Sequence, residues 1–485
     1  MNPMNIDFDG GSTGAVNENA LGALQKALEM GYGTDSATLT GGGALRVQSL
    51  DTTMQATIAQ SKHFVLFNRL PKPKIGSTVD EWTEQSEAGG VLGGSTNTET
   101  GDIQDATGQY DRRVGMVKYL MTRRSVSLVA NITQNIVDAK ATEHSNGAVQ
   151  LLSDANFLSY EGDSSVVPTE FDGIAAQLKA AVTSGQVDND HVIDMRGGPL
   201  NSVEPFTRAG AAVSSYGSFG VPTDVFWSQG VQADMDANLD PAFRVNLTGN
   251  SEAIKLGSPV KGIALSDGDV KVNKDVFIPN DKMLAPYEAR GAIYAASASK
   301  NDSLKPTLAV ANAAADAASR FEAAHAGAYY WLVCGLNAKG QSTGVVSAAK
   351  SIATGESVTL TITASAGGQE TGYAVYRSRK GGTNAPADFR LLKRVAKAGA
   401  TTTFVDRNVF IPGTTRAYML NLTPGDTAIT WRQLLPMFKF ELFPTSQPVL
   451  PWAQMLFGYL RISKLKHHAM FDNILPNNAT WKPFG

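Results

Sequence analysis

The first 61 residues carry few apolar positions that recur with a regular period. A short helical pattern over residues 17–30 lies between glycine-rich stretches such as GGGAL, and a second one covers residues 50–60. A chain of this composition buries too little apolar surface to form a core of its own. We therefore expect an extended N-terminal arm.

The next stretch places a long polar segment between two apolar runs. HFVLFNRL (63–70) is predicted as a strand, which Pro71 and Pro73 end. The polar residues 76–102 follow, and VGMVKYLMTRRSVS (114–127) is predicted as a second strand. This pattern indicates an extended β-hairpin. Because an isolated two-stranded hairpin is marginally stable in water, we expect it to lie on a neighbouring subunit.

Residues 132–155 are predicted to form a long helix. Its apolar residues recur at helical intervals, at Ile132, Ile136, Ala139, Val149 and Leu152. The middle of the helix is polar (KATEHSN). We therefore expect the helix to lie across a surface rather than through a core.

Helices and short strands alternate from residue 165 to residue 303, which predicts an α/β unit. The expected elements are a helix over 171–182, the strand HVIDM, a helix over 201–216, a strand over 224–227, and the hairpin PVKGIALSDGDVKV. The Asp267-Gly268 pair in that hairpin is a turn signal.

Residues 304–424 change to strands and turns. Runs such as YYWLVCGLNAKGQS, SVTLTITAS, GYAVYRSRKGG, TTFVDRN and TRAYMLNL follow at spacings of roughly 10–15 residues, a pattern typical of a β-sandwich. After Gly425 the sequence is aromatic and proline-rich, and we expect the chain to return to the unit that it left. An inserted domain with adjacent termini is predicted.

Composition limits the possible functions. The 485 residues suggest about three domains, and the net charge of −3 gives no basic excess, which argues against a dedicated DNA-binding protein. The single cysteine, Cys334, excludes an intramolecular disulfide, and its apolar surroundings predict a buried thiol. The N-terminus resembles no secretory signal, and no apolar run reaches the roughly 18 residues of a membrane span.

Catalytic motifs give no support for an enzyme, and we expect no cofactor and no metal. GxSxG occurs at residues 10–14, in the expected arm, and at 340–344, in an expected β-turn, whereas a nucleophile elbow needs a strand, a sharp turn and a helix. His467 and His468 are neighbours on an expected strand and would point to opposite faces. Asp188, Asp190 and Asp194 lack the spacing of an EF-hand loop and are interpreted as a solvated turn.

The order of these elements resembles the HK97-like capsid fold of tailed-bacteriophage major capsid proteins, an α+β fold built from an N-arm, an E-loop, a spine helix, an A-domain and a P-domain. Five segments carry the resemblance: DRRVGMVKYLMTRRSVS (111–127), NFLSYEGDSS (156–165), FDGIAAQLKAAV (171–182), GVPTDVFWS (220–228) and LFGYLRISKLKHHAMFDNIL (456–475). The family's pattern covers residues 50–300 and 425–485.

The β insert is similar to immunoglobulin or fibronectin-III-like domains through GYAVYRS, TFVD (403–406) and PGTTRAY. It departs from them in one respect, because YYWLVCGLNAKGQS, a segment normally found late in such domains, comes first here. The resemblance implies these domains: N-terminal arm 1–61, E-loop hairpin with flanking P-domain strands 62–125, spine helix 126–164, A-domain 165–303, inserted immunoglobulin-like domain 304–424, and a return with a closing strand 425–485.

The resemblance implies a structural protein whose copies form hexamers and pentamers and close into an icosahedral shell around double-stranded DNA, without sequence-specific binding. A portal and scaffolding or decoration proteins are the implied partners, with no membrane involved. The implied location is the virion, assembled in the cytoplasm of the host bacterium.

Charged pairs on the hairpin's returning strand are the candidate contacts between subunits. They are interpreted either as a solvated edge protected by charge or as salt bridges to acidic groups of a neighbour. An aromatic residue in the same polar stretch is a plausible interface anchor. The candidates are Trp82, Glu81, Glu84, Arg112, Arg113, Arg123 and Arg124.

Two alternatives remain open. An encapsulin-like compartment would share the fold but hold cargo protein. An adhesin or tail-associated binding protein would act through the inserted β domain, but the hairpin and the polar helix would then have no purpose.

Overall fold

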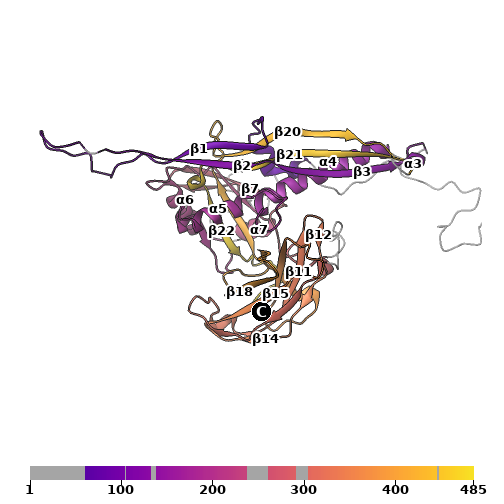
Figure 1. Ribbon diagram of the computed structural model, residues 1–485. Coiled ribbons are helices and arrows are strands. Elements are labelled where there is room, and N and C mark those ends of the chain that lie inside the picture. The colour runs from indigo at the N-terminus through magenta and orange to yellow at the C-terminus, as the bar shows by residue number, and fades with distance from the viewer. Residues whose placement is uncertain (1–60, 104, 133–137, 238–259, 291–303, 445–446) are drawn as a thin grey trace, which may run out of the picture.

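The computed structural model describes residues 61–103, 105–132, 138–237, 260–290, 304–444 and 447–485 (Figure 1). Residues 1–60, where the N-terminal arm was expected, lie outside the described residues. The described chain is a mixed α+β structure, and its elements follow the expected order of hairpin, long helix, α/β unit, β insert and closing strands.

A projecting hairpin opens the described chain. Strand β1 (Val79–Glu87) pairs antiparallel with β2 (Gln109–Met116), so a hairpin is present, but its first strand lies in the polar stretch 76–102 and not in HFVLFNRL as predicted. We call these strands and the connecting residues 88–108 the hairpin arm, and residues 88–108 the hairpin tip. In Figure 1 the tip extends far from the rest of the molecule.

The segment before the arm differs from expectation. HFVLFNRL was predicted as a strand, but its middle forms the short helix α2 (Val65–Arg69). Leu66 and Phe67 are buried, and the backbone N–H of Phe67 donates to Oδ1 of Asn156, 3.1 Å away. Periodicity cannot distinguish a strand from a helix in so short an apolar run, and burial against the long helix decides the outcome.

A three-stranded antiparallel sheet and the long helix form one layer. Its strand order is β20 (Ile429–Glu441), β21 (Val449–Ile462) and β3 (Lys118–Ser127). The long helix α4 (Ala139–Glu161) lies along this sheet, as Figure 1 shows, and follows the short helix α3 (Leu128–Ile132). The carboxylate of Asp138 accepts hydrogen bonds from the first N–H groups of α4 and fixes its start.

A six-stranded mixed sheet forms the centre of the body. Its order is β4 (Val192–Asp194), β22 (Ala469–Ile474), β19 (Thr415–Leu420), β5 (Asp224–Trp227), β7 (Gly268–Lys274) and β6 (Gly262–Leu265). Side chains on one face, including Phe226, Tyr418 and Met470, share a core with α4 and α5 (Ile174–Thr183). The opposite face packs on α6 (Glu204–Ser214). Buried residues of α7 (Gln229–Ala237) belong to the same core. Because both faces are covered there, the inner strands β5, β19 and β22 are buried at nearly every position.

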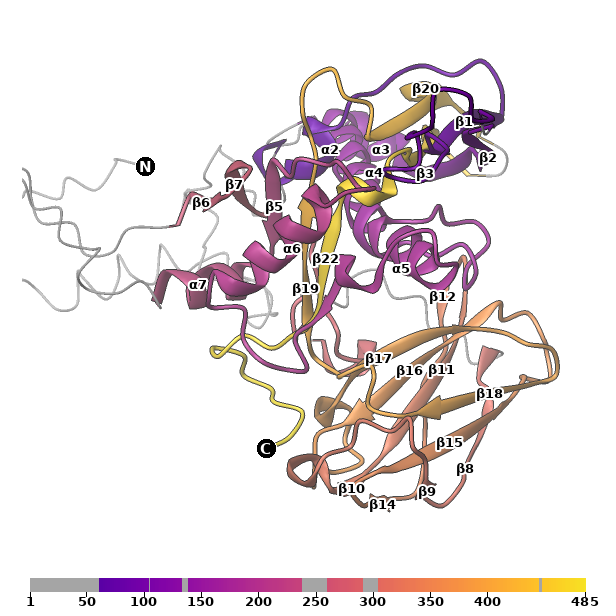
Figure 2. The ribbon, with the colours of Figure 1, turned by 90° about the vertical axis from the view of Figure 1, so that its left-hand side faces the viewer.

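Two sheets of short strands make up residues 304–411, which we call the insert (Figure 2). One sheet has the order β12 (Gly340–Gln341), β11 (Trp331–Asn337), β16 (Gly372–Ser378), β17 (Phe389–Ala396), with β13 (Val345–Val346) beside β11. The other has β18 (Thr401–Asp406), β15 (Glu356–Thr363) and β8 (Thr307–Val310), with β9 (Ala314–Ala315) beside β15. A two-stranded pair joins β10 (Gly327–Tyr329) and β14 (Lys350–Ile352).

One strand expected in the insert belongs to the body. TRAYMLNL was assigned to the β domain that was to end at residue 424, but Thr415–Leu420 is β19 of the central sheet. Met419 pairs with Val225 on one side and with Ala469 on the other. Its apolar alternation fits either sheet, and only the long-range pairing decides between them.

A buried ion pair organises the interior of the insert. Nη1 of Arg377 lies 3.0 and 2.9 Å from the two carboxylate oxygens of Asp406, and both side chains are almost fully buried. Asp406 also accepts a hydrogen bond from the Trp331 indole at 3.0 Å. The guanidinium lies over the rings of Phe321 and Tyr329. Several partners therefore replace the water that the two charges lose on burial.

We predict that Asp406→Asn destabilises the chain by about 3–5 kcal/mol, because it leaves the Arg377 charge buried without its counter-ion. The matched control is Asp190→Asn, which removes the exposed pair between Asp190 and Arg208 and should cost no more than about 1 kcal/mol. Urea titration followed by tryptophan fluorescence measures both. Equal, small effects would contradict the prediction.

Candidate functional site

The base of the hairpin arm is fixed to the body through one carboxylate. Asp80 is 8% exposed and accepts hydrogen bonds from Nε and Nη2 of Arg432, at 2.8 and 3.0 Å, and from the hydroxyl of Tyr459 at 2.6 Å. Arg461 lies 3.4 Å away. Burial by itself would raise the pKa of Asp80, but the hydrogen bonds and charges of Arg432, Tyr459 and Arg461 outweigh it and lower that pKa.

Four of the candidate contact residues pair with one another across the hairpin. Glu81 forms an ion pair with Arg112, and Glu84 lies 3.2 Å from Nε of Arg113. The antiparallel register makes this possible. Glu81 is opposite Val114 and Glu84 is opposite Asp111, so each glutamate lies on the same face as the arginine two residues away on the other strand. One of the two interpretations of these arginines placed their acidic partners in a neighbouring subunit. In the structure, Arg112 and Arg113 pair with acidic residues of their own hairpin.

Trp82 lies at the junction of the arm and the body. The guanidinium of Arg461 is 5.3 Å from the centre of its indole ring. The Nε1 atom of Trp82 is buried and has no hydrogen-bond partner among the described residues. Trp82 was expected to be an exposed anchor, but it is half-buried against its own chain.

The two remaining candidates point to opposite sides of β3. Arg124 donates from Nη1 to Glu143 at 2.9 Å and from Nη2 to Gln150 at 2.7 Å, and so connects the sheet to α4. Arg123 is exposed. Alternation along a strand predicts this split, but only the tertiary structure shows that the helix covers the side of Arg124.

The hairpin tip carries a surface that the candidate set missed. Val91, Leu92 and Ile103 are 81%, 78% and 92% exposed. The sequence from residue 88 to residue 111 contains carboxylates but no lysine or arginine. The sequence shows these residues only as isolated apolar positions in a polar stretch. The structure shows that the tip lies apart from the body (Figure 1).

Exposed apolar side chains continue from the tip along the arm and into β3. They alternate with polar residues, as expected for one face of a strand. They are Val79, Tyr110, Val114, Met116, Tyr119 and Met121. Contiguous apolar residues of this kind on a surface mark contacts with another macromolecule.

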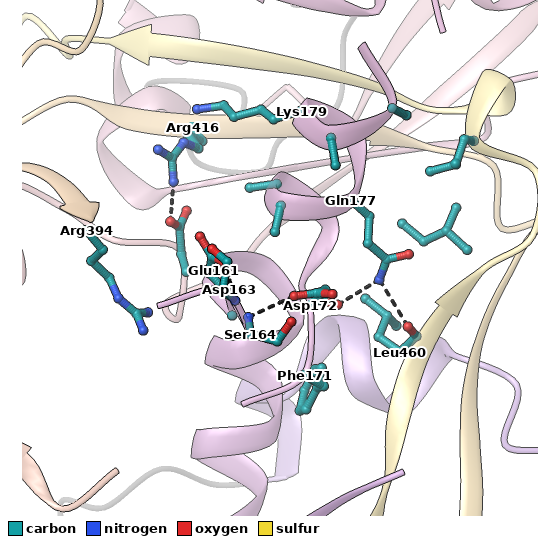
Figure 3. A pocket seen from close by; sticks show the side chains of 18 of the residues that line it. Glu161, Asp163, Ser164, Phe171, Asp172, Gln177, Lys179, Arg394, Arg416 and Leu460 are labelled. Carbon is teal, nitrogen blue, oxygen red and sulfur yellow. Dashed lines mark hydrogen bonds and ion pairs between the residues drawn. The ribbon is translucent and has the colours of Figure 1, made fainter. Parts of the chain in front are cut away.

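A groove of about 920 Å³ runs between the base of the arm, the end of α4, helix α5 and strand β17 of the insert (Figure 3). Beneath it lies a network of charges. Arg416 forms an ion pair with Glu161, and its Nε donates to Asp472 at 2.9 Å. Lys179 donates to the same Asp472 carboxylate at 2.6 Å, and Tyr418 donates to Glu161 at 3.0 Å.

The network shifts the ionisation of its members. Burial would raise the pKa of Asp472, but the charges of Arg416 and Lys179 outweigh it and hold that pKa well below its usual range. Burial and the neighbouring Glu161 carboxylate raise the pKa of Tyr418 well above its usual value. The ion pairs of the network join α4, α5 and the central sheet, and burial lowers the pKa of Lys179.

The catalytic patterns considered from the sequence do not form a site where the structure describes them. Ser342 of the second GxSxG is buried, and its hydroxyl accepts from the N–H of Gly335 and donates to the carbonyl of Thr343. Burial lowers the pKa of His468 to about 3. The first GxSxG lies outside the described residues.

The structure also shows the surroundings of the acidic residues and of the cysteine that the sequence singled out. Asp190 pairs with Arg208, and Asp194 pairs with Arg320. Within the described ranges, no three His, Cys, Asp or Glu side chains are grouped as metal ligands, and no helix is long and apolar enough to cross a membrane. Cys334 is buried, as predicted, and burial raises the pKa of its thiol.

Comparison with known proteins gives a relative over nearly the whole chain. No family model matches. The chain is 22% identical over 470 residues to the major capsid protein of Staphylococcus phage S25-3, a match that covers 93% of this chain and 94% of that protein. The chain is therefore similar in sequence to a phage major capsid protein from end to end.

Solved structures give weaker likenesses. The capsid of the native GTA particle has a TM-score of 0.45 and 9% identity, over 91% of this chain and 99% of that chain. The SrpI encapsulin of Synechococcus elongatus has a TM-score of 0.39 and 8% identity, over 89% and 93%. At these scores neither structure decides between a virus shell and a protein compartment.

We predict that Asp472→Asn lowers stability at neutral pH and makes the loss of stability on acidification shallower. The unfolded carboxyl titrates near pH ~4 and the folded one lower, so its contribution is complete above pH ~4 and is lost as the pH falls through the folded pKa. Urea titrations between pH 2 and 7 of wild type, of this variant and of the exposed control Asp102→Asn test it. Parallel pH curves for all three would contradict it.

Proposed function

We propose that this chain is the major capsid protein of a tailed bacteriophage, which assembles into hexamers and pentamers of an icosahedral shell around double-stranded DNA. The observation that carries the proposal is the sequence similarity to a phage major capsid protein over 93% of the chain. The observed order of hairpin, long helix, α/β unit and closing strands supports it independently.

The hairpin arm gives the assembly its physical basis. In a monomer, Val91, Leu92 and Ile103 would remain in water. Burying each of them against another copy gains roughly 1.5–3 kcal/mol, a gain that is repeated at every contact in a shell. A single chain derives no stability from holding these side chains away from its body.

The pairing observed within the arm changes the expected contact between subunits. We propose that the hairpin tip and the apolar face of β2 and β3 supply most of the contact. Glu81–Arg112 and Glu84–Arg113 keep the two strands in register, and Asp80 fixes the direction of the arm. Of the charged candidates, exposed Arg123 is the one best suited to a salt bridge with a neighbour.

The proposed domain division follows the sequence prediction with one change. The proposed division keeps the order of E-loop hairpin, spine helix and A-domain, with α4 (Ala139–Glu161) as the spine helix, and it ends the insert before β19 rather than at residue 424. We propose that the insert is an immunoglobulin-like domain and that it projects from the outer surface of the shell. Its two packed sheets support the first proposal.

The proposed surroundings follow from the assembly. A net charge of −3 suits a wall that confines DNA without binding it tightly. The location would be the virion, assembled in the host cytoplasm, with a portal and scaffolding or decoration proteins as partners. No catalytic role is proposed.

The second candidate is an encapsulin-like compartment, which would hold cargo protein in place of DNA. The sequence match to a phage capsid protein favours the virus. An adhesin or tail-associated protein is disfavoured because it would leave the apolar hairpin tip without a partner.

Light scattering of the purified chain, with negative-stain images of the same fraction, tests the proposal. We expect closed shells or rings of five or six subunits, and nuclease-resistant DNA in shells isolated from infected cells. Shells that contain only protein cargo would favour the compartment. A stable 51.4 kDa monomer that never assembles, even with phage partners present, would contradict both.

We predict that the triple variant Val91→Ser, Leu92→Ser, Ile103→Ser folds normally but forms no shells. These side chains are exposed in the single chain, so the free energy of unfolding should change by no more than about 0.5 kcal/mol. The control is Val346→Ser, which changes an exposed valine of the insert and should leave assembly intact. Normal shell yield from the triple variant would exclude the tip as a contact.

A further inference from the structure

Residues 475–485 cross from the body to the insert. After β22 the chain passes beside α7, where the N–H of Asn477 donates to the buried carboxylate of Asp234 at 2.6 Å. The N–H of Leu475 donates to the carbonyl of Gly198 at 3.0 Å. Figure 2 shows this yellow segment continuing down to the side of the insert. One end of the segment is thus fixed to the body.

The other end of the segment is bound by the insert. Trp481 is 5% exposed, its Nε1 donates to the carbonyl of Asp388 at 3.1 Å, and the guanidinium of Arg390 lies 5.1 Å from its ring centre. The N–H of Lys380 donates to the carbonyl of Pro483 at 2.8 Å. The ring of Phe484 stacks on that of His325 at 4.0 Å.

A glycine makes room for the Trp481 ring. Gly413, in the connection from the insert to β19, has a φ of +77°, and a Cβ atom there would lie 2.6 Å from the Trp481 ring. No other residue type fits this position without moving the tryptophan. The Trp481 ring therefore packs directly against the backbone of the connection at Gly413.

The insert also has other contacts with the body. Asn473 of β22 donates to the carbonyl of Val409 at 2.9 Å and accepts from the N–H of Ile411 at 3.1 Å, and the ammonium of Lys179 lies 5.2 Å from the ring centre of Phe410. Arg394 pairs with Glu170 at 2.8 Å, Arg320 pairs with Asp194, and the N–H of Leu391 donates to the carbonyl of Leu284 at 2.7 Å. The two ion pairs are partly exposed and contribute little to stability. The buried Trp481 ring is the larger apolar anchor among these contacts.

We propose that residues 475–485 are a strap that fixes the orientation of the insert on the body. The strap packs beside the connection that contains Gly413, and none of its residues belongs to the core clusters of the insert. Release of the strap would leave the insert folded but less firmly held on the body. The proposal concerns the single chain and stands apart from the proposed assembly.

Hydrogen–deuterium exchange of Trp481→Ala, measured on the unassembled chain, tests the strap. Exchange in peptides that contain the Lys380 amide should be at least about tenfold faster, because loss of a buried indole removes the anchor. Peptides from the core strand β15 should keep their protection. Lys482→Ala, which changes an exposed side chain of the same segment, is the control and should exchange like wild type.

A second variant tests the strap through a residue that lies outside it. Gly413→Ala should displace the Trp481 ring and produce the same pattern of exchange. Unchanged exchange at Lys380 in both variants would overturn the proposal. So would faster exchange throughout β15, since Trp481 would then belong to the folding core of the insert. If shells form, cryo-EM of the Trp481→Ala shell should show weakened density for the insert over an unchanged body.

Discussion

The pairing of β19 between β5 and β22 is the constraint on which the rest of the structure depends. Tyr418 lies in one cross-strand row with Phe226 and Met470, and the three side chains face the same core. The strand arrives only after the insert, so the body cannot close until the chain has left it and returned. Strands β5 and β7 precede the insert and strands β19 and β22 follow it, so the central sheet is built from segments on both sides of the insert.

Ion pairs between distant segments extend this constraint across the body. Arg416, on β19 itself, reaches Glu161 at the end of α4 and Asp472 on β22. Asp80 connects the arm to β20 in the same way, through Arg432. Each pair is partly buried, so loss of one partner would leave a poorly solvated charge. These ion pairs thus hold the long helix to the central sheet, and the arm to the three-stranded sheet.

The same body leaves other surfaces without partners. The hairpin tip and the outer face of β2 expose apolar side chains that no packing within the chain requires. The insert, by contrast, has its own core and its own buried ion pair. A rigid body, an arm that needs a neighbour and a separately folded insert are the properties of a building unit.

The sequence by itself determined the order of the elements, the presence of a hairpin but not its first strand, the long polar helix and the presence of a β unit before residue 425, because these depend on local periodicity and turn residues. It also determined that Cys334 is buried. Only the tertiary structure decided that HFVLFNRL contains a helix, that Thr415–Leu420 joins the body, and that Arg112, Arg113 and Arg124 find partners within the chain. Each of these outcomes rests on contacts between residues far apart in the sequence, where two arrangements satisfy the same local pattern and burial selects one of them.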